Sequence, residues 1–226
     1  MTLLGGAALG IAAGLLLVPL TRRELAAAIV RSGSPGGEAP ASIRDHATPQ
    51  ITRGHWVALA VVSGLLPAYL LHKVGWTPNA LPPLLLLVGL VQLAYCDLTH
   101  RLLPKTLVYA LSVAVISSGV IVALSTSEWD RLVLASLGGI TSFALFFVVN
   151  LMNPRWMAFG DVRLSLVFGF GLAWVSPLDL FEAFFYANVL AVVVALGLMA
   201  VRRADRKSAL PFGVFMALGA ALVLFT

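Results

Sequence analysis

Long apolar runs separated by short polar stretches dominate the chain. Eight runs approach the length of about 20 residues that a helix needs to cross a bilayer core. They cover approximately residues 2–20, 56–72, 79–96, 104–124, 131–151, 161–176, 181–201 and 209–226. The pattern therefore predicts an all-α fold, a polytopic membrane protein with about eight transmembrane helices.

Composition supports a membrane protein. Of the 226 residues, 60% are hydrophobic and 11% are charged, and the mean hydropathy is +0.96. A soluble domain carries about 25% charged residues, so we exclude that class. Cys96 is the single cysteine, which excludes a disulfide within the chain and a cysteine metal cluster. We expect no metal site.

The basic residues follow the order of the apolar runs. All Lys and Arg residues except Lys73 and Arg131 fall in the loops after the first, third, fifth and seventh runs or within the first three residues of the run that follows. Positive charge collects in cytoplasmic loops, so we expect these loops inside and both termini outside the cytoplasm. This asymmetry explains the net charge of +5 without nucleic-acid binding. The tryptophans near run ends are expected as interfacial anchors: Trp56, Trp76, Trp129, Trp156 and Trp174.

One long polar loop divides the chain. Residues 21–55 are rich in Gly, Pro and Ser between positions 32 and 42, which favours a flexible cytoplasmic loop. We therefore expect a two-helix N-terminal region over residues 1–72 and a six-helix domain over residues 79–226.

Two acids stand where an apolar helix meets the cytoplasm. Asp97 directly follows the third run, and Asp161 opens the sixth. Both fall at the same predicted depth, so they can meet if their helices pack together. Two structural roles stay open: Asp161 as a helix N-cap, and Asp97 as an interfacial acid paired with Arg101 or Lys105.

A close pair of carboxylates has a defined chemical use. Like charges prevent both from ionising easily, so one keeps a proton and the other stays charged. The charged acid can take a proton from a water that attacks a peptide carbonyl, while the protonated acid donates to the carbonyl oxygen. This is the chemistry of an aspartic protease.

Three stretches resemble one family, in the same order. They are "YCDLTHRLLPKTLVYAL", "AFGDVRLSLVFGFGLAW" and "ALPFGVFMALGA". Their matching positions are Asp97, His100, Leu102, Leu103, Pro104, Gly160, Asp161, Val162, Arg163, Leu164, Pro211, Phe212 and Gly213. The chain thus resembles the type IV prepilin peptidases, which are membrane aspartic proteases of the GxGD class.

The resemblance implies a function and a site. Asp97 and Asp161 would be the catalytic pair. The supporting residues would be Gly160, Pro104, Pro211, Phe212, Gly213, His100 and Arg163. Gly160 and Gly213 would allow backbone to approach the pair, and Pro104 and Pro211 would suit the first turns of helices.

The implied substrates are prepilins or pilin-like secretion subunits with a basic leader and a hydrophobic N-terminal helix. They would be cut at the cytoplasmic face of the bacterial inner membrane. Peptide hydrolysis would need no cofactor. S-adenosylmethionine would be needed only if the chain also methylates the new N-terminus.

Several positions depart from the family pattern. Ala158 stands where the first glycine of the GxGD motif is expected, and it limits backbone freedom there. Lys105 and Val214 also differ. Residues 21–55 contain no cysteine, whereas many relatives that methylate carry cysteine pairs in this loop. The sequence leaves methyl transfer open.

Two other classes of function use the same residues. A transporter or proton-relay protein could carry protons on paired carboxylates, but it would place them nearer mid-span. A non-catalytic membrane scaffold could keep the fold, and Ala158 favours that alternative.

Overall fold

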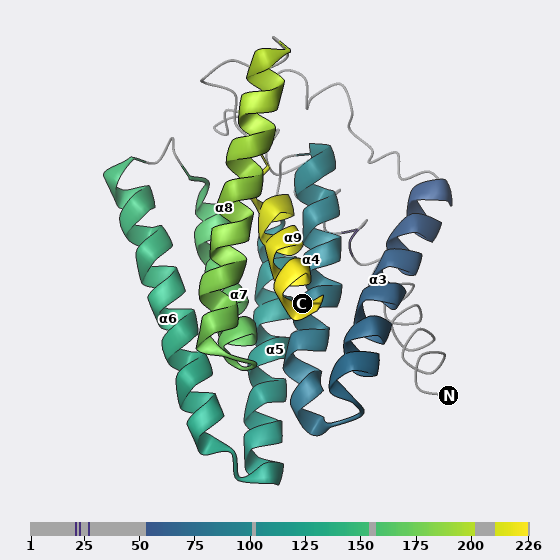
Figure 1. Ribbon diagram of the computed structural model, residues 1–226, viewed down its shortest axis with the longest axis vertical. Coiled ribbons are helices and arrows are strands. Elements are labelled where there is room, and N and C mark those ends of the chain that lie inside the picture. Colours follow the sequence, from purple (N-terminus) through teal and green to yellow (C-terminus); the bar gives the residue numbers. More distant parts are fainter. Residues whose placement is uncertain are drawn as a thin grey trace.

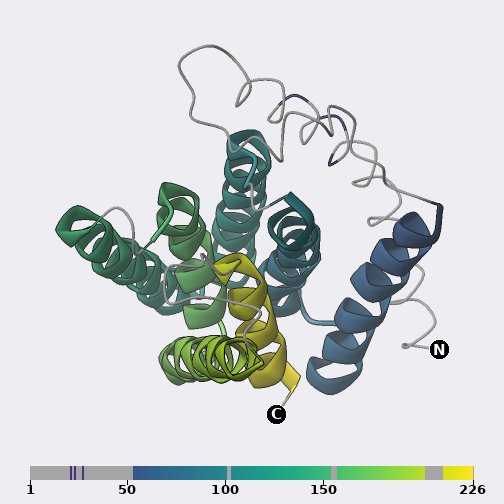
Figure 2. The same ribbon diagram turned by 90° about the horizontal axis from the view of Figure 1, so that it is seen from above.

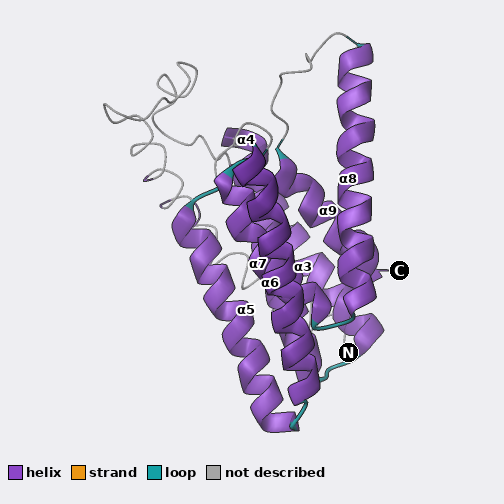
Figure 3. Cartoon of the chain, turned by 90° about the vertical axis from the view of Figure 1, so that its left-hand side faces the viewer, coloured by secondary structure: helices purple, strands orange, loops and turns teal. Residues whose placement is uncertain are grey.

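The computed structural model describes Thr21, Arg23, Ala27 and residues 53–100, 103–153, 157–201 and 211–225. Every element in these ranges is a helix, as Figure 3 shows. They are α3 (Arg53–Val74), the 3-10 turn η1 (Pro78–Ala80), α4 (Leu81–His100), α5 (Lys105–Thr126), α6 (Trp129–Met152), α7 (Phe159–Ala173), α8 (Pro177–Ala200) and α9 (Phe212–Phe225). The all-α prediction is confirmed. The predicted helix over residues 2–20 lies outside the described residues.

Four of the described helices are long and apolar enough to cross a membrane. They are Pro78–Thr99, α5, α6 and α8. Within the described residues, Val61–His72 and α9 are apolar but shorter, and α7 has 15 residues. The chain is thus a multi-pass membrane protein, and helices form because a bilayer offers backbone groups no other partners. The count of eight spans and the positions of the termini stay predictions, as does the division between residues 72 and 79.

Successive helices from α4 onward run up and down the bundle (Figure 1). Because of this alternation, the C-terminal end of α4 and the N-terminal ends of α7 and α9 lie at one end, the upper end in Figure 1. Seen from above, α9 lies between α8 and α4 (Figure 2), and it contacts both. Three helix ends that are distant in sequence therefore converge.

Small residues hold α7 and α9 close to their neighbours. A Cβ added at Gly138 of α6 would lie 2.4 Å from the Cβ of Ala173 in α7. A Cβ at Gly219 of α9 would lie 2.3 Å from the carbonyl oxygen of Ala183 in α8. Such contacts let helix backbones approach closely in membranes.

One predicted membrane anchor is wrong. Trp174 is 1% exposed, and its indole Nε1 donates a hydrogen bond to the Asn79 carbonyl at 3.1 Å. It therefore packs inside the bundle, because that carbonyl gives the buried indole a partner. Trp76 and Trp129 are 52% and 51% exposed, as interfacial anchors would be. The side chains of Trp56 and Trp156 lie outside the described part.

Candidate active site

Asp97 lies in the last turn of α4 and is 6% exposed. The backbone N–H of Gly213, in the first turn of α9, donates a hydrogen bond to its Oδ2 at 2.8 Å. The third apolar run was expected to end at residue 96, but α4 continues to His100. Asp97 is thus a buried residue in the last turn of its helix. The alternative in which it pairs with Arg101 is not tested, because Arg101 lies outside the described residues.

Asp161 is the third residue of α7 and is also 6% exposed. The N-cap of this helix is Ala158, whose carbonyl accepts a hydrogen bond from the Asp161 N–H at 3.0 Å. The N-cap interpretation of Asp161 is therefore wrong, because α7 begins at Phe159 and the acid already lies within its first turn.

The structure brings these two acids together. Asp161 belongs to α7, which is not one of the four described helices long enough to cross a membrane. Burial, and then the nearby charge of Asp97, raise the pKa of the Asp161 carboxyl from its ordinary 3.8 to about 7, against a backbone hydrogen bond at Ala158 that lowers it. Burial beside Asp97 therefore favours the protonated form of the Asp161 carboxyl.

The connection between α4 and α5 packs on the first turn of α7. A Cβ added at Gly160 would lie 3.1 Å from the Cβ of Leu103. The close neighbour of Gly160 is thus this side chain rather than the backbone that the sequence suggested. Pro104 is the N-cap of α5, one residue before the first turn, and its carbonyl accepts from the Leu107 and Val108 amides at 3.1 and 3.2 Å.

The third motif opens α9 beside Asp97. Pro211 directly precedes the helix, and the Phe212 ring lies 5.9 Å from the ring of Phe146 in α6. A Cβ at Gly213 would lie 2.9 Å from the Asp97 Oδ2. A glycine at position 213 therefore allows its amide to reach the acid.

The basic residues predicted near the pair have varied surroundings. The Arg163 guanidinium lies 4.5 Å from the Phe159 ring centroid and 5.7 Å from that of Tyr109, as cation–π contacts do. Lys105 is exposed. The side chain of His100 and all of Arg101 lie outside the described residues, so their predicted roles are not tested.

Ala158 fits its position without strain. Its φ of −71° and ψ of 142° are extended, a conformation that any residue adopts. The residue is exposed. An alanine in place of the first GxGD glycine therefore leaves this turn intact.

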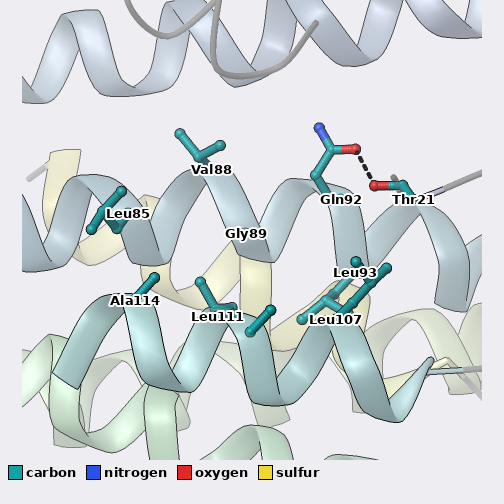
Figure 4. Close-up of a pocket in the computed structure, with 10 residues that line it drawn as sticks. Thr21, Leu85, Val88, Gly89, Gln92, Leu93, Leu107, Leu111 and Ala114 are labelled. Carbon is teal, nitrogen blue, oxygen red and sulfur yellow. Dashed lines mark hydrogen bonds between the residues drawn. The ribbon is translucent and has the colours of Figure 1, made fainter. Parts of the chain in front are cut away.

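Neither acid lines the described cavity. It has a volume of about 320 Å³ and lies between α4 and α5 (Figure 4). It is lined by Thr21, Leu85, Val88, Gly89, Gln92, Leu93, Leu107, Ala110, Leu111 and Ala114. None of these is acidic, so the cavity holds no group for acid–base chemistry.

Gln92, at one end of this cavity, is a buried polar residue that sequence reasoning missed. It is 3% exposed. Its side chain accepts from the Thr21 hydroxyl at 3.3 Å and donates to the Ser63 hydroxyl at 3.0 Å. An amide within the apolar stretch "VGLVQLAYC" was the available signal.

Cys96, next to Asp97, is fully buried in the core. In the part of the chain that the structure describes, no three His, Cys, Asp or Glu side chains gather as metal ligands would.

Known proteins match this chain across the region that holds both acids. Residues 84–198, half of the chain, match the type IV leader peptidase family. Three relatives are each named prepilin leader peptidase/N-methyltransferase. The protein of Stutzerimonas stutzeri is 26% identical over 71% of this chain and 55% of its own length.

The other two relatives are similar. The Pseudomonas aeruginosa protein is 27% identical over 73% of this chain and 56% of its own length, and the Legionella pneumophila protein is 28% identical over 71% and 55%. The chain thus spans about half the length of these relatives. No solved structure is significantly similar to it. By the match over residues 84–198, which contain Asp97 and Asp161, the chain belongs to the type IV leader peptidase family.

Proposed function

We propose that this protein is a membrane aspartic endopeptidase that removes the leader of type IV prepilins or pilin-like secretion subunits. One observation carries the proposal: Asp97 and Asp161 are both buried, come from separate helices, and lie close enough at one end of the bundle for the charge of Asp97 to raise the pKa of Asp161. Membership of the family and the names of the three relatives support the same function.

The pair supplies what peptide hydrolysis needs. One ionised carboxylate takes a proton from a water, whose oxygen attacks the peptide carbonyl carbon. The protonated partner donates to the carbonyl oxygen, and a tetrahedral diol forms. Transfer of a proton to the amide nitrogen then breaks the carbon–nitrogen bond and restores the pair. We propose that this hydrolysis uses only the two acids and water and needs no cofactor.

The position of the pair favours a bond at the membrane surface. Asp97 lies in the last turn of its helix and Asp161 in the first turn of its own. A proton-relay protein would place acids nearer mid-span. Irregular backbone at membrane depth is tolerated only inside protein or beside water, so a substrate helix unwinds more easily at this end. We propose that this end of the bundle lies at the cytoplasmic face of the bacterial inner membrane.

Co-expression with a prepilin tests this function. The substrate carries a basic leader before its hydrophobic N-terminal helix, and a gel shift reports leader removal. The wild type should cleave, while Asp97→Asn and Asp161→Asn should insert into the membrane but leave the substrate intact. The mass of the product gives the cleavage site, and an added methyl group would reveal methyl transfer from S-adenosylmethionine.

Two outcomes would contradict the proposal. If either variant cleaves as well as the wild type, the two acids are not the catalytic pair. If the wild type cleaves none of the prepilins encoded in its own genome, the scaffold alternative replaces the enzyme.

A further inference from the structure

The two acids of the pair have different surroundings. Asp97 accepts a hydrogen bond from the Gly213 N–H at 2.8 Å. That amide lies in the first turn of α9, where no earlier carbonyl of the helix is available to it. The N-terminal end of a helix also carries a partial positive charge, which favours an anion.

The approach of α9 to Asp97 depends on the residue at position 213. A side-chain carbon there would lie 2.9 Å from the Asp97 Oδ2 and 3.4 Å from its carboxyl carbon. Pro211 precedes the helix and has no N–H of its own. The start of α9 is therefore built to bring one amide onto one carboxylate oxygen.

The surroundings of Asp161 favour its protonated form. The residue is buried at the start of α7, where the first cause of its raised pKa is burial and the second is the charge of Asp97. The described charged side chains at this end of the elements around α4 are Arg163 of α7 and Lys105 of α5, besides the pair itself. The described residues of α9 include no charged side chain.

We infer that the Gly213 amide holds Asp97 as the charged, water-activating member of the pair and leaves Asp161 as the proton donor. This inference rests on the proposed function and assigns its two roles. Gly213 is a positioning residue, because it acts through Asp97.

The assignment gives each proton a route. The attacking water loses a proton to the Asp97 carboxylate while its oxygen bonds to the carbonyl carbon. Asp161 gives its proton to the carbonyl oxygen. When the diol collapses, Asp97 passes its proton to the leaving nitrogen and Asp161 takes one back from a diol hydroxyl. No oxidant, reductant or co-reactant beyond water is needed.

Infrared spectroscopy of the purified protein tests the assignment without any substrate. At about pH 5.5, exposed acids with ordinary pKa values of about 4 are ionised, so a protonated-carboxyl C=O band reports a buried acid. The wild type should show this band. Asp161→Asn should lose it, and Asp97→Asn should keep it. Loss of the band in Asp97→Asn together with its retention in Asp161→Asn would overturn the inference. Retention of the band in both variants would also overturn it.

A pair of substitutions at position 213 isolates the amide. Gly213→Pro and Gly213→Ala both add a Cβ beside Asp97, but only the proline removes the N–H. In the Asp161→Asn background, the Asp97 protonated-carboxyl band should appear at a pH about 1–2 units higher with proline than with alanine, as expected for the loss of a hydrogen bond to a charged group. The added Cβ crowds the amide contact in both variants, so the deciding comparison is with Gly213 intact in the Asp161→Asn background. If the proline variant titrates at the same pH as that protein, the amide does not set the charge of Asp97.

The rate of leader cleavage gives a second readout. With proline, the acidic limb of the pH–rate profile should move to higher pH relative to alanine. A uniform loss of rate at every pH would mean a purely structural role for Gly213. If the wild type cleaves nothing, the proposed function fails, whereas the infrared bands still decide the charge assignment.

Discussion

Both ends of the bundle hold an acid near a helix terminus, but in opposite surroundings. At one end, Asp97 and Asp161 are each 6% exposed, and each bears on the ionisation of the other. At the other end, the side chain of Glu128 is 34% exposed and pairs with Arg131. Its two oxygens also accept from the Asn79 amide at 2.9 and 3.1 Å.

This difference separates a structural acid from a candidate catalytic one. Glu128 has a cation and an amide for partners, and its exposed pair contributes about 0–1 kcal/mol. A carboxylate buried beside a second carboxylate is costly to ionise. Such an arrangement does not stabilise a fold, so the proposed catalysis is expected at the end that holds Asp97 and Asp161 rather than at the opposite end.

The largest expected effect follows from removing one acid at each end. Asp97→Asn and Asp161→Asn should each lower the initial rate of leader cleavage by about 10²–10⁴-fold, the usual contribution of general acid–base catalysis. Glu128→Gln should keep the wild-type rate, measured with purified protein in detergent. A loss of similar size in Glu128→Gln would mean that the two ends do not differ in function.

A smaller loss of cleavage rate is expected from crowding the end of the bundle that holds Asp97 and Asp161. Gly160→Val should press against Leu103 and lower the cleavage rate about ten-fold, since overpacking costs about 1–3 kcal/mol. Leu103→Ala in the same chain should restore part of that rate. Gly197→Val is the matched control, because a Cβ there meets nothing within 4 Å. Failure of Leu103→Ala to rescue would disprove the contact as the cause.

The stability of the protein should depend on pH through Asp161. Its pKa in the folded protein is about 7, above the ordinary 3.8. The free energy of unfolding therefore falls as pH increases between these two values. Above pH 7 the full loss of stability is present, and Asp161→Asn should raise Tm by about 4 °C or more. Below about pH 4 that gain should vanish. Glu128→Gln should show no gain at either pH, and an equal gain in both variants would refute the distinction.

The smallest expected effect is at Ala158. Restoring glycine with Ala158→Gly should change the cleavage rate by no more than about two-fold, as for an exposed residue with an unstrained backbone. A gain of ten-fold or more in the same assay would show that alanine limits the enzyme, in contrast to the relaxed turn in the structure.

The sequence predicted the helices better than their ends. Apolar runs showed where α3 to α9 lie, because a bilayer admits few alternatives to a helix. The ends were less certain: α4 continues through Asp97 to His100, and α7 begins before Asp161. Polar residues at a membrane surface fit a helix or a loop equally well, so composition alone could not place them.

Contacts between distant segments were beyond local pattern. The resemblance pointed to Gly213, yet nothing in "ALPFGVFMALGA" shows that its amide reaches Asp97. The burial of Trp174 against Asn79 likewise depends on how α7 and η1 pack. Such contacts follow from the tertiary arrangement, which a periodic pattern does not encode.

One measurement tests the meeting of the two acids most directly. Cys96 is the only cysteine of the chain, so Cys96→Ala provides a background for introduced pairs. In that background, Asp97→Cys with Asp161→Cys should be joined by a short thiol cross-linker in membranes, with the linked peptides identified by mass spectrometry. Asp97→Cys with Glu128→Cys, at opposite ends, should not be joined. Efficient linkage of the second pair, or none of the first, would contradict the convergence of α4 and α7 on which the proposed catalysis depends.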